Sequence, residues 1–145
     1  MILTSLISFP GFADSYRIDG EFTGCDFDKY YPIGGFDLLV KCEGYKEFFS
    51  FMPEVITHEG EVITIDNIAI EATLLEGSSI KTYISDEFDG CDVKKKYKFD
   101  NELMFECSSY SYSYSFKPKV LILTPDFKMP IVYIDGEEYK GILIY

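Results

Sequence analysis

An internal duplication is the feature of this 145-residue sequence that most constrains its fold. Residues 21–26 (EFTGCD) recur as residues 87–92 (EFDGCD), an offset of 66. The match continues at this offset through Lys29/Lys95 and Tyr31/Tyr97. After a one-residue gap the offset is 65, with identical pairs that include Cys42/Cys107, Tyr45/Tyr110 and Phe51/Phe116, and after a short insertion it is 69, as for Asp66/Asp135. Self-similarity at a fixed spacing is the signature of a repeated structural unit. We therefore predict two tandem copies, residues 1–76 with an N-terminal strand and residues 77–145.

The repeat also helps to distinguish strand from helix. Residues 109–116 (SYSYSYSF) alternate serine with aromatic residues, a period of two that a strand uses and a helix does not. Because corresponding segments of two copies share a fold, residues 44–51 (GYKEFFSF) are predicted to be a strand as well, although alone they could pass for a short helix.

Turn residues complete the fold prediction. Asp66-Asn67 and Asp135-Gly136 each separate two apolar runs and predict type I′ hairpins, while Pro53 and Pro118 predict strand ends or edges. Apolar segments at residues 3–7, 72–75 and 141–144 are expected to be docked strands. No segment keeps a helical period, so the class is all-β and mostly antiparallel. Since each copy is small, we expect the two to pack as a pseudo-two-fold sandwich or barrel.

The four cysteines form one pair in each copy, Cys25 with Cys42 and Cys91 with Cys107. Buried free thiols are the favoured interpretation, because residues 1–13 lack the basic start of a signal peptide. Disulfides within each copy are the alternative, since strand neighbours at this separation can face each other. A zinc site is disfavoured because no C-x-x-C is present. A cytoplasmic protein, or one within an assembled particle, is expected rather than a secreted one.

The charge of the chain excludes several function classes. With 25 acidic and 13 basic residues the net charge is -12, which disfavours direct binding to nucleic acid or to an anionic membrane. Residues 1–76 carry 14 acidic and 4 basic residues, a net of -10, and residues 77–145 carry 11 and 9, a net of -2. The first copy is therefore predicted to face a partner with a basic surface.

Candidate chemistry is sparse in this sequence. The single histidine, His58, corresponds to Leu123 in the second copy, and no nucleotide-binding, hydrolase or zinc-protease motif is present. We predict no catalytic residue, no cofactor and no metal site. The acidic residues around His58 and in the first copy's Cys25 loop are interpreted as solvated, and as candidates for protein binding: Glu59, Glu61, Asp26 and Asp28.

The alternating tyrosines Tyr110, Tyr112 and Tyr114 are the most visible feature of the second copy. Their favoured interpretation is the core face of a sandwich, because a domain of this size must bury large side chains. The alternative is an exposed platform that binds protein or sugar.

These observations resemble no known family and favour a non-enzymatic protein that binds other proteins. The first hypothesis is a small structural or assembly component of a larger particle such as a virion, and self-association belongs to that expectation. The second is an acidic inhibitor, of the immunity or anti-defence kind, which blocks a basic nucleic-acid-binding surface. The third is a carbohydrate-binding β module that uses the three tyrosines.

Overall fold

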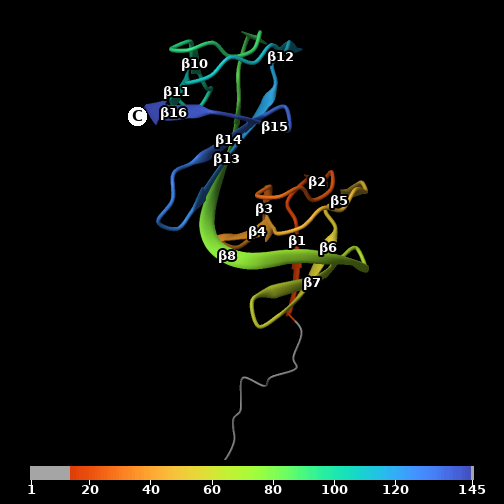
Figure 1. Ribbon diagram of the computed structural model, residues 1–145. Helices are drawn as coiled ribbons and strands as arrows, with labels where there is room; N and C mark the ends of the chain where they lie inside the picture. The colour runs from red at the N-terminus through yellow and green to blue at the C-terminus, as the bar shows by residue number, and fades with distance from the viewer. Residues whose placement is uncertain (1–13, 145) are drawn as a thin grey trace, which may run out of the picture. The chain divides into compact units, whose positions relative to one another are not determined.

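The structure, a computed structural model, describes residues 14–144. Over that range the chain is all-β, without helix, and its strands pair antiparallel, as the sequence predicts. It divides into two compact units, Met1–Gly77 and Ser78–Tyr145 (Figure 1). The described residues accordingly form no helix that could cross a membrane. The strand predicted at residues 3–7 and the question of a signal peptide both lie outside the described residues.

Unit 1 has one branched sheet and one short two-stranded sheet. In the main sheet the order is β1-β6-β7-β8, and β4 pairs with both β8 and β3, while β2 pairs with β5 separately. The elements are β1 (Asp14–Arg17), β2 (Glu21–Phe22), β3 (Tyr30–Pro32), β4 (Leu38–Cys42), β5 (Ser50–Phe51), β6 (Glu54–His58), β7 (Glu61–Ile65) and the first part of β8 (Ile68–Tyr83).

Unit 2 repeats this pattern of pairing with the last part of β8 and eight further strands. Strand β8 is followed in the sheet by β13, β14 and β15; a second sheet has the order β10-β11-β16, and β9 pairs with β12. These elements are β9 (Glu87–Phe88), β10 (Lys96–Lys98), β11 (Met104–Cys107), β12 (Ser115–Phe116), β13 (Lys119–Pro125), β14 (Ile131–Ile134), β15 (Glu137–Tyr139) and β16 (Gly141–Ile144).

Corresponding residues make corresponding hydrogen bonds in the two units. The backbone N–H of Ile18 donates to the carbonyl of Pro53 at 3.1 Å, and that of Ile84 donates to Pro118 at 3.1 Å. The two predicted hairpin turns have positive φ at both central residues, with 55° and 64° in one and 53° and 86° in the other. The two units therefore use the same strand pairings. The common origin of the copies and their pseudo-two-fold packing stay predictions.

Each unit has its own aromatic core. In unit 1 the buried ring of Phe22 lies 4.8 Å from that of Tyr31, and in unit 2 Phe88 lies 4.8 Å from Tyr97. Further buried rings in unit 2 are those of Phe99 and Phe105. Burial of these large side chains supplies most of the driving force that a small unit has available.

The strands predicted over residues 44–51 and 109–116 are shorter than expected. Neither segment is helical, but each has only one isolated bridge, at Lys46 or Ser111, and a two-residue strand, β5 or β12. Opposite each segment lies a glycine with positive φ, Gly24 or Gly90. A Cβ on Gly90 would lie 2.3 Å from the carbonyl oxygen of Ser111. These glycines let the backbones approach closely, and the strand pairing is interrupted there, as at a β-bulge.

Candidate binding surfaces

The four cysteines form two disulfides, Cys25–Cys42 and Cys91–Cys107, so the favoured prediction of free thiols was wrong. Their Cα atoms lie 5.4 and 5.5 Å apart, and all four residues are buried. The turn after Cys25 brings the first pair together, because the N–H of Asp28 donates to the carbonyl of Cys42 at 3.2 Å. Lys94 and Cys107 make the same contact at 2.9 Å.

The three alternating tyrosines of unit 2 are exposed, so the prediction that they form a core face was wrong. Tyr110, Tyr112 and Tyr114 are 73%, 77% and 58% exposed, and together with Phe116 they form what we call the tyrosine row. Of the intervening serines, Ser113 and Ser115 are half-buried and Ser111 is exposed. Ser113 and Ser115 face the unit because phenylalanine rings already fill its core, and the large aromatic side chains therefore point to solvent.

Unit 1 has a corresponding exposed row with a different composition. We define the first-unit row as Tyr45, Glu47, Phe49 and Phe51, whose aromatic members are also exposed. Polar contacts involve one tyrosine of each row. Tyr114 donates to Glu87 Oε1 at 2.8 Å, which raises the pKa of the Tyr114 hydroxyl, and Tyr45 lies 3.4 Å from Glu47 Oε2.

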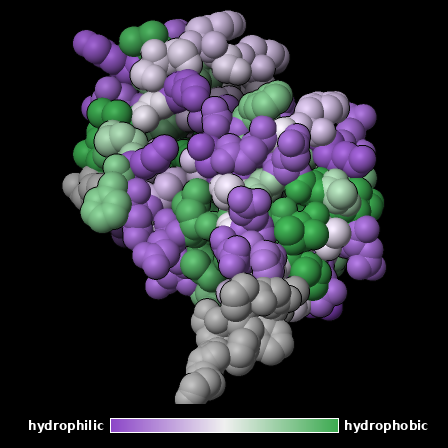
Figure 2. All heavy atoms as spheres, turned by 60° about the horizontal axis from the view of Figure 1, so that its bottom comes forward, coloured by the Kyte–Doolittle hydropathy of each residue, from purple (hydrophilic) through white to green (hydrophobic). Residues whose placement is uncertain are grey.

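Further exposed apolar side chains were not singled out from the sequence. Phe27 is exposed, as is its counterpart Val93. In the loop between β13 and β14, Phe127 is fully exposed with a φ of 63° and Met129 is also exposed. The sequence indicated this loop through the change from 65 to 69 in the offset between matching residues, which marks an insertion relative to the short turn of unit 1. Figure 2 shows one face of the molecule, on which apolar residues form separate patches among polar ones.

The four acidic candidates lie in two exposed turns of unit 1. Asp26 accepts the N–H of Phe27 at 2.9 Å, and Asp28, with a φ of 64°, lies 3.7 Å from Lys41 Nζ. In the turn between β6 and β7, Glu59 Oε2 lies 3.7 Å from His58 Nε2, and Glu61 begins β7. No group of three metal-ligating side chains is found within residues 14–144.

Asp26 also has a local structural role. Its counterpart Asp92 accepts the N–H of Val93 at 2.8 Å, as Asp26 does from Phe27. A carboxylate that accepts a nearby backbone N–H stabilises a tight turn. The presence of an aspartate at this place in both units is therefore explained by the turn.

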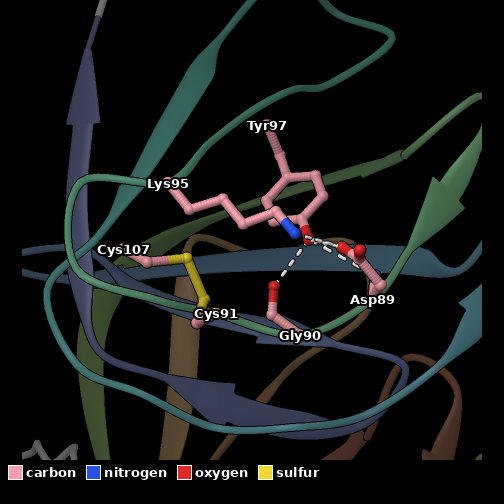
Figure 3. A network of polar contacts seen from close by, with 6 residues as sticks. All are labelled: Asp89, Gly90, Cys91, Lys95, Tyr97 and Cys107. Carbon is pink, nitrogen blue, oxygen red and sulfur yellow. Dashed lines mark hydrogen bonds and ion pairs between the residues drawn. A yellow bond between two sulfur atoms is a disulfide. The ribbon is translucent and has the colours of Figure 1, made fainter.

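A polar network beside the second disulfide was also missed (Figure 3). The Tyr97 hydroxyl lies 2.6 Å from the carbonyl oxygen of Gly90 and 2.5 Å from Asp89 Oδ1, and Lys95 Nζ donates to the same Asp89 oxygen. The network thus holds residues 89–91, the backbone against which the tyrosine row lies. The identical pairs Lys29/Lys95 and Tyr31/Tyr97 were the features of the sequence that indicated this network.

Unit 1 has a less charged version of this network. Tyr31 donates to the carbonyl of Gly24 at 2.5 Å, and Lys29 Nζ donates to Thr23 Oγ1 at 3.3 Å. Thr23 therefore stands where unit 2 has Asp89. In unit 2 the Lys95 ammonium, and then the Tyr97 hydroxyl, hold the pKa of Asp89 below its ordinary value, while burial raises the pKa of Tyr97.

Replacing Asp89 with threonine, the residue of unit 1, is expected to reduce the loss of stability in acid. The folded state lowers the pKa of Asp89, so the ionised carboxylate stabilises the fold above its unfolded pKa of about 3.9, and this contribution is lost as the pH falls through the folded value. Urea denaturation at a series of pH values between about 5 and 2 measures the difference. Lys95→Met should reduce the same slope, and identical slopes in wild type and both variants would contradict the assignment.

The described surface thus offers exposed aromatic rings, hydroxyls and carboxylates, which are the groups that protein and sugar partners contact. Comparison of the chain with known family models, with curated proteins and with solved structures gives no match.

Proposed function

We propose that this protein is a non-enzymatic binding protein, a small structural or assembly component that associates with other proteins in a larger particle. The observation that carries the proposal is the exposed tyrosine row. Exposure of three tyrosines in succession leaves a large aromatic area in water, and such areas on a soluble protein are typical of interaction sites. Tyrosine and phenylalanine are also enriched where proteins bind each other.

In this proposal the two units bind different partners, because their net charges differ. Unit 1 has 14 acidic and 4 basic residues, and its candidates Glu59, Glu61, Asp26 and Asp28 are all exposed. This surface suits a neighbour with a basic face. The nearly neutral unit 2 suits a neighbour that buries the tyrosine row.

The disulfides bear on where such a particle would be found. Disulfides persist in oxidising surroundings, such as the outside of a cell or the surface of a virion, and are rare in the cytosol. Two of them in a chain of this size favour an assembled particle or an exported protein over a cytoplasmic one.

A triple substitution of Tyr110, Tyr112 and Tyr114 with serine is the test of the row. All three side chains are exposed, so we expect the variant to fold and to bind a partner isolated from the native source at least about tenfold more weakly. Affinity is measured by calorimetry on the purified partner, and Phe49→Ser with Phe51→Ser in the first-unit row is the matched control. A folded triple variant with unchanged affinity for every partner found would contradict the proposal.

A carbohydrate-binding module is the second candidate, and the same exposure favours it. Side chains two residues apart on an extended strand are separated by about 6.6–6.8 Å and lie on one face, which suits the stacking of sugar rings. Tyr112→Ala should abolish glycan binding measured by NMR titration. Glycan binding that is unchanged in the folded variant would exclude the row as the sugar site.

The hypothesis of an acidic inhibitor stays a prediction. A steep fall of the affinity for its partner as the salt concentration rises would distinguish an inhibitor from an assembly component.

A further inference from the structure

The segment of the tyrosine row lacks the charged side chains and the prolines that commonly prevent a strand edge from pairing with another chain. Residues 108–116 (SSYSYSYSF) contain no charge, no glycine and no proline. The corresponding residues 43–51 (EGYKEFFSF) contain Glu43, Lys46, Glu47 and a glycine. Charged side chains on an edge prevent pairing between sheets, and uncharged segments of high β propensity promote it. Unit 1 is thus protected at this place and unit 2 is not.

From residue 109 to residue 116 the backbone of this segment has one edge paired and the other open, whereas the N–H of Ser108 already donates to the carbonyl of Lys140 at 3.0 Å. Ser111 exchanges two hydrogen bonds with Cys91, at 2.9 and 2.7 Å, and the N–H of Lys117 donates to Asp86 at 3.0 Å. Successive strand residues direct their backbone groups to opposite edges. The groups of Tyr112 and Tyr114 therefore point away from residues 86–91, and no backbone hydrogen bond between described residues involves them.

The direction of these groups fixes which residues a second copy would meet. In an antiparallel pair of two identical edges, the residues that exchange hydrogen bonds are those whose groups point outward. Here these are the aromatic positions, so tyrosine must lie opposite tyrosine, with Tyr110 facing Tyr114 when Tyr112 lies on the two-fold axis. Aromatic cross-strand pairs stabilise a sheet, and the pattern is complementary to itself.

Charge also favours a second copy at this surface over one at unit 1. Two copies that meet through unit 1 each bring a net charge of -10, whereas unit 2 carries -2. Repulsion between like charges opposes the first arrangement and hardly affects the second.

We propose that residues 109–116 add as a strand to the same segment of a second copy, forming a symmetric dimer through unit 2. The inference rests on the proposed function, since it names one partner of the tyrosine row. In this dimer the acidic unit 1 of each copy stays free to bind other proteins. An assembly component that lies between dissimilar neighbours requires such a second binding surface.

Sedimentation velocity on the full chain with intact disulfides tests the dimer. Wild type should shift from monomer to dimer as the concentration rises. Tyr112→Lys places two like charges at the two-fold axis and should weaken dimerisation about tenfold or more. Because the side chain is exposed, its melting temperature should equal that of wild type at concentrations where both are monomers. Phe49→Lys makes the same change of charge in the first-unit row and should leave the dimer intact.

A further variant tests the backbone pairing itself. Tyr112→Pro removes an outward N–H, so dimerisation should be lost while thermal unfolding reports whether the unit still folds. A folded Tyr112→Pro protein that dimerises like wild type overturns strand addition, and so does a Tyr112→Lys variant with undiminished dimerisation. A wild type that stays monomeric at about millimolar concentration, yet binds a different protein through Tyr112, overturns self-pairing and leaves the proposed function standing.

Discussion

Replacing both Cys91 and Cys107 with alanine is expected to lower the free energy of unfolding by about 3 kcal/mol. The disulfide closes a loop of 16 residues and so restricts the unfolded chain, whose entropy rises when the bond is absent. Both side chains are buried, so each alanine also leaves a small void. A unit of this size has a stability of only a few kcal/mol, and the loss is therefore a large share of it. Urea denaturation, followed by the fluorescence of the 12 tyrosines, measures the change.

The matched control is the corresponding double substitution in unit 1, Cys25→Ala with Cys42→Ala. Its loop of 17 residues predicts nearly the same loss, again about 3 kcal/mol. Treating wild type with a reductant should lower its stability beyond either variant, because both bonds are then broken. Four titratable thiols in denatured protein purified without a reductant would show that the bonds are absent and would overturn the prediction.

The all-β class could be predicted because the two similar halves of the sequence constrain each other's interpretation. The alternation of residues 109–116 excluded a helix, and their alignment extended that conclusion to residues 44–51, which are ambiguous alone. The hairpins at Asp66 and Asp135 followed from local turn chemistry, which requires positive φ at those residues. These features depend on local sequence and are accessible without coordinates.

The state of the cysteines and the orientation of the tyrosines depended on contacts that the sequence does not contain. A separation of 16 or 17 residues suits a disulfide and two free thiols equally, until the turn at Asp28 sets the distance. An alternating segment has two faces, and its pattern does not say which one lies inward. Ser113 and Ser115 face the unit here because other rings already occupy the core, and that is decided by packing between distant segments.

A second large effect on the free energy of unfolding is expected at Gly141 and Phe105, a neighbouring pair of residues that differs between the cores of the two units. A Cβ on Gly141 would lie 2.6 Å from Cζ of the buried Phe105 ring and 2.2 Å from the carbonyl oxygen of Glu106. The corresponding residues of unit 1 are Ala72 and Val40, both buried. The glycine of unit 2 therefore makes room for a larger neighbour, and the smaller valine of unit 1 permits an alanine.

Gly141→Ala should destabilise the protein by about 1–3 kcal/mol through overpacking, and Phe105→Val by about 2–4 kcal/mol through the cavity that it leaves. The double variant reproduces the pair of unit 1, so its loss should be smaller than the sum by at least about 1 kcal/mol in a double-mutant cycle measured by urea denaturation. The reverse cycle, Val40→Phe with Ala72→Gly, is the control in unit 1 and should show coupling of the same sign. Additivity within about 0.5 kcal/mol in both cycles would mean that the ring does not require the glycine. The close approach of β16 to the Glu106 carbonyl would then be the only reason for a glycine at position 141. Gly141→Ala would in that case lower the free energy of unfolding equally with phenylalanine or with valine at position 105.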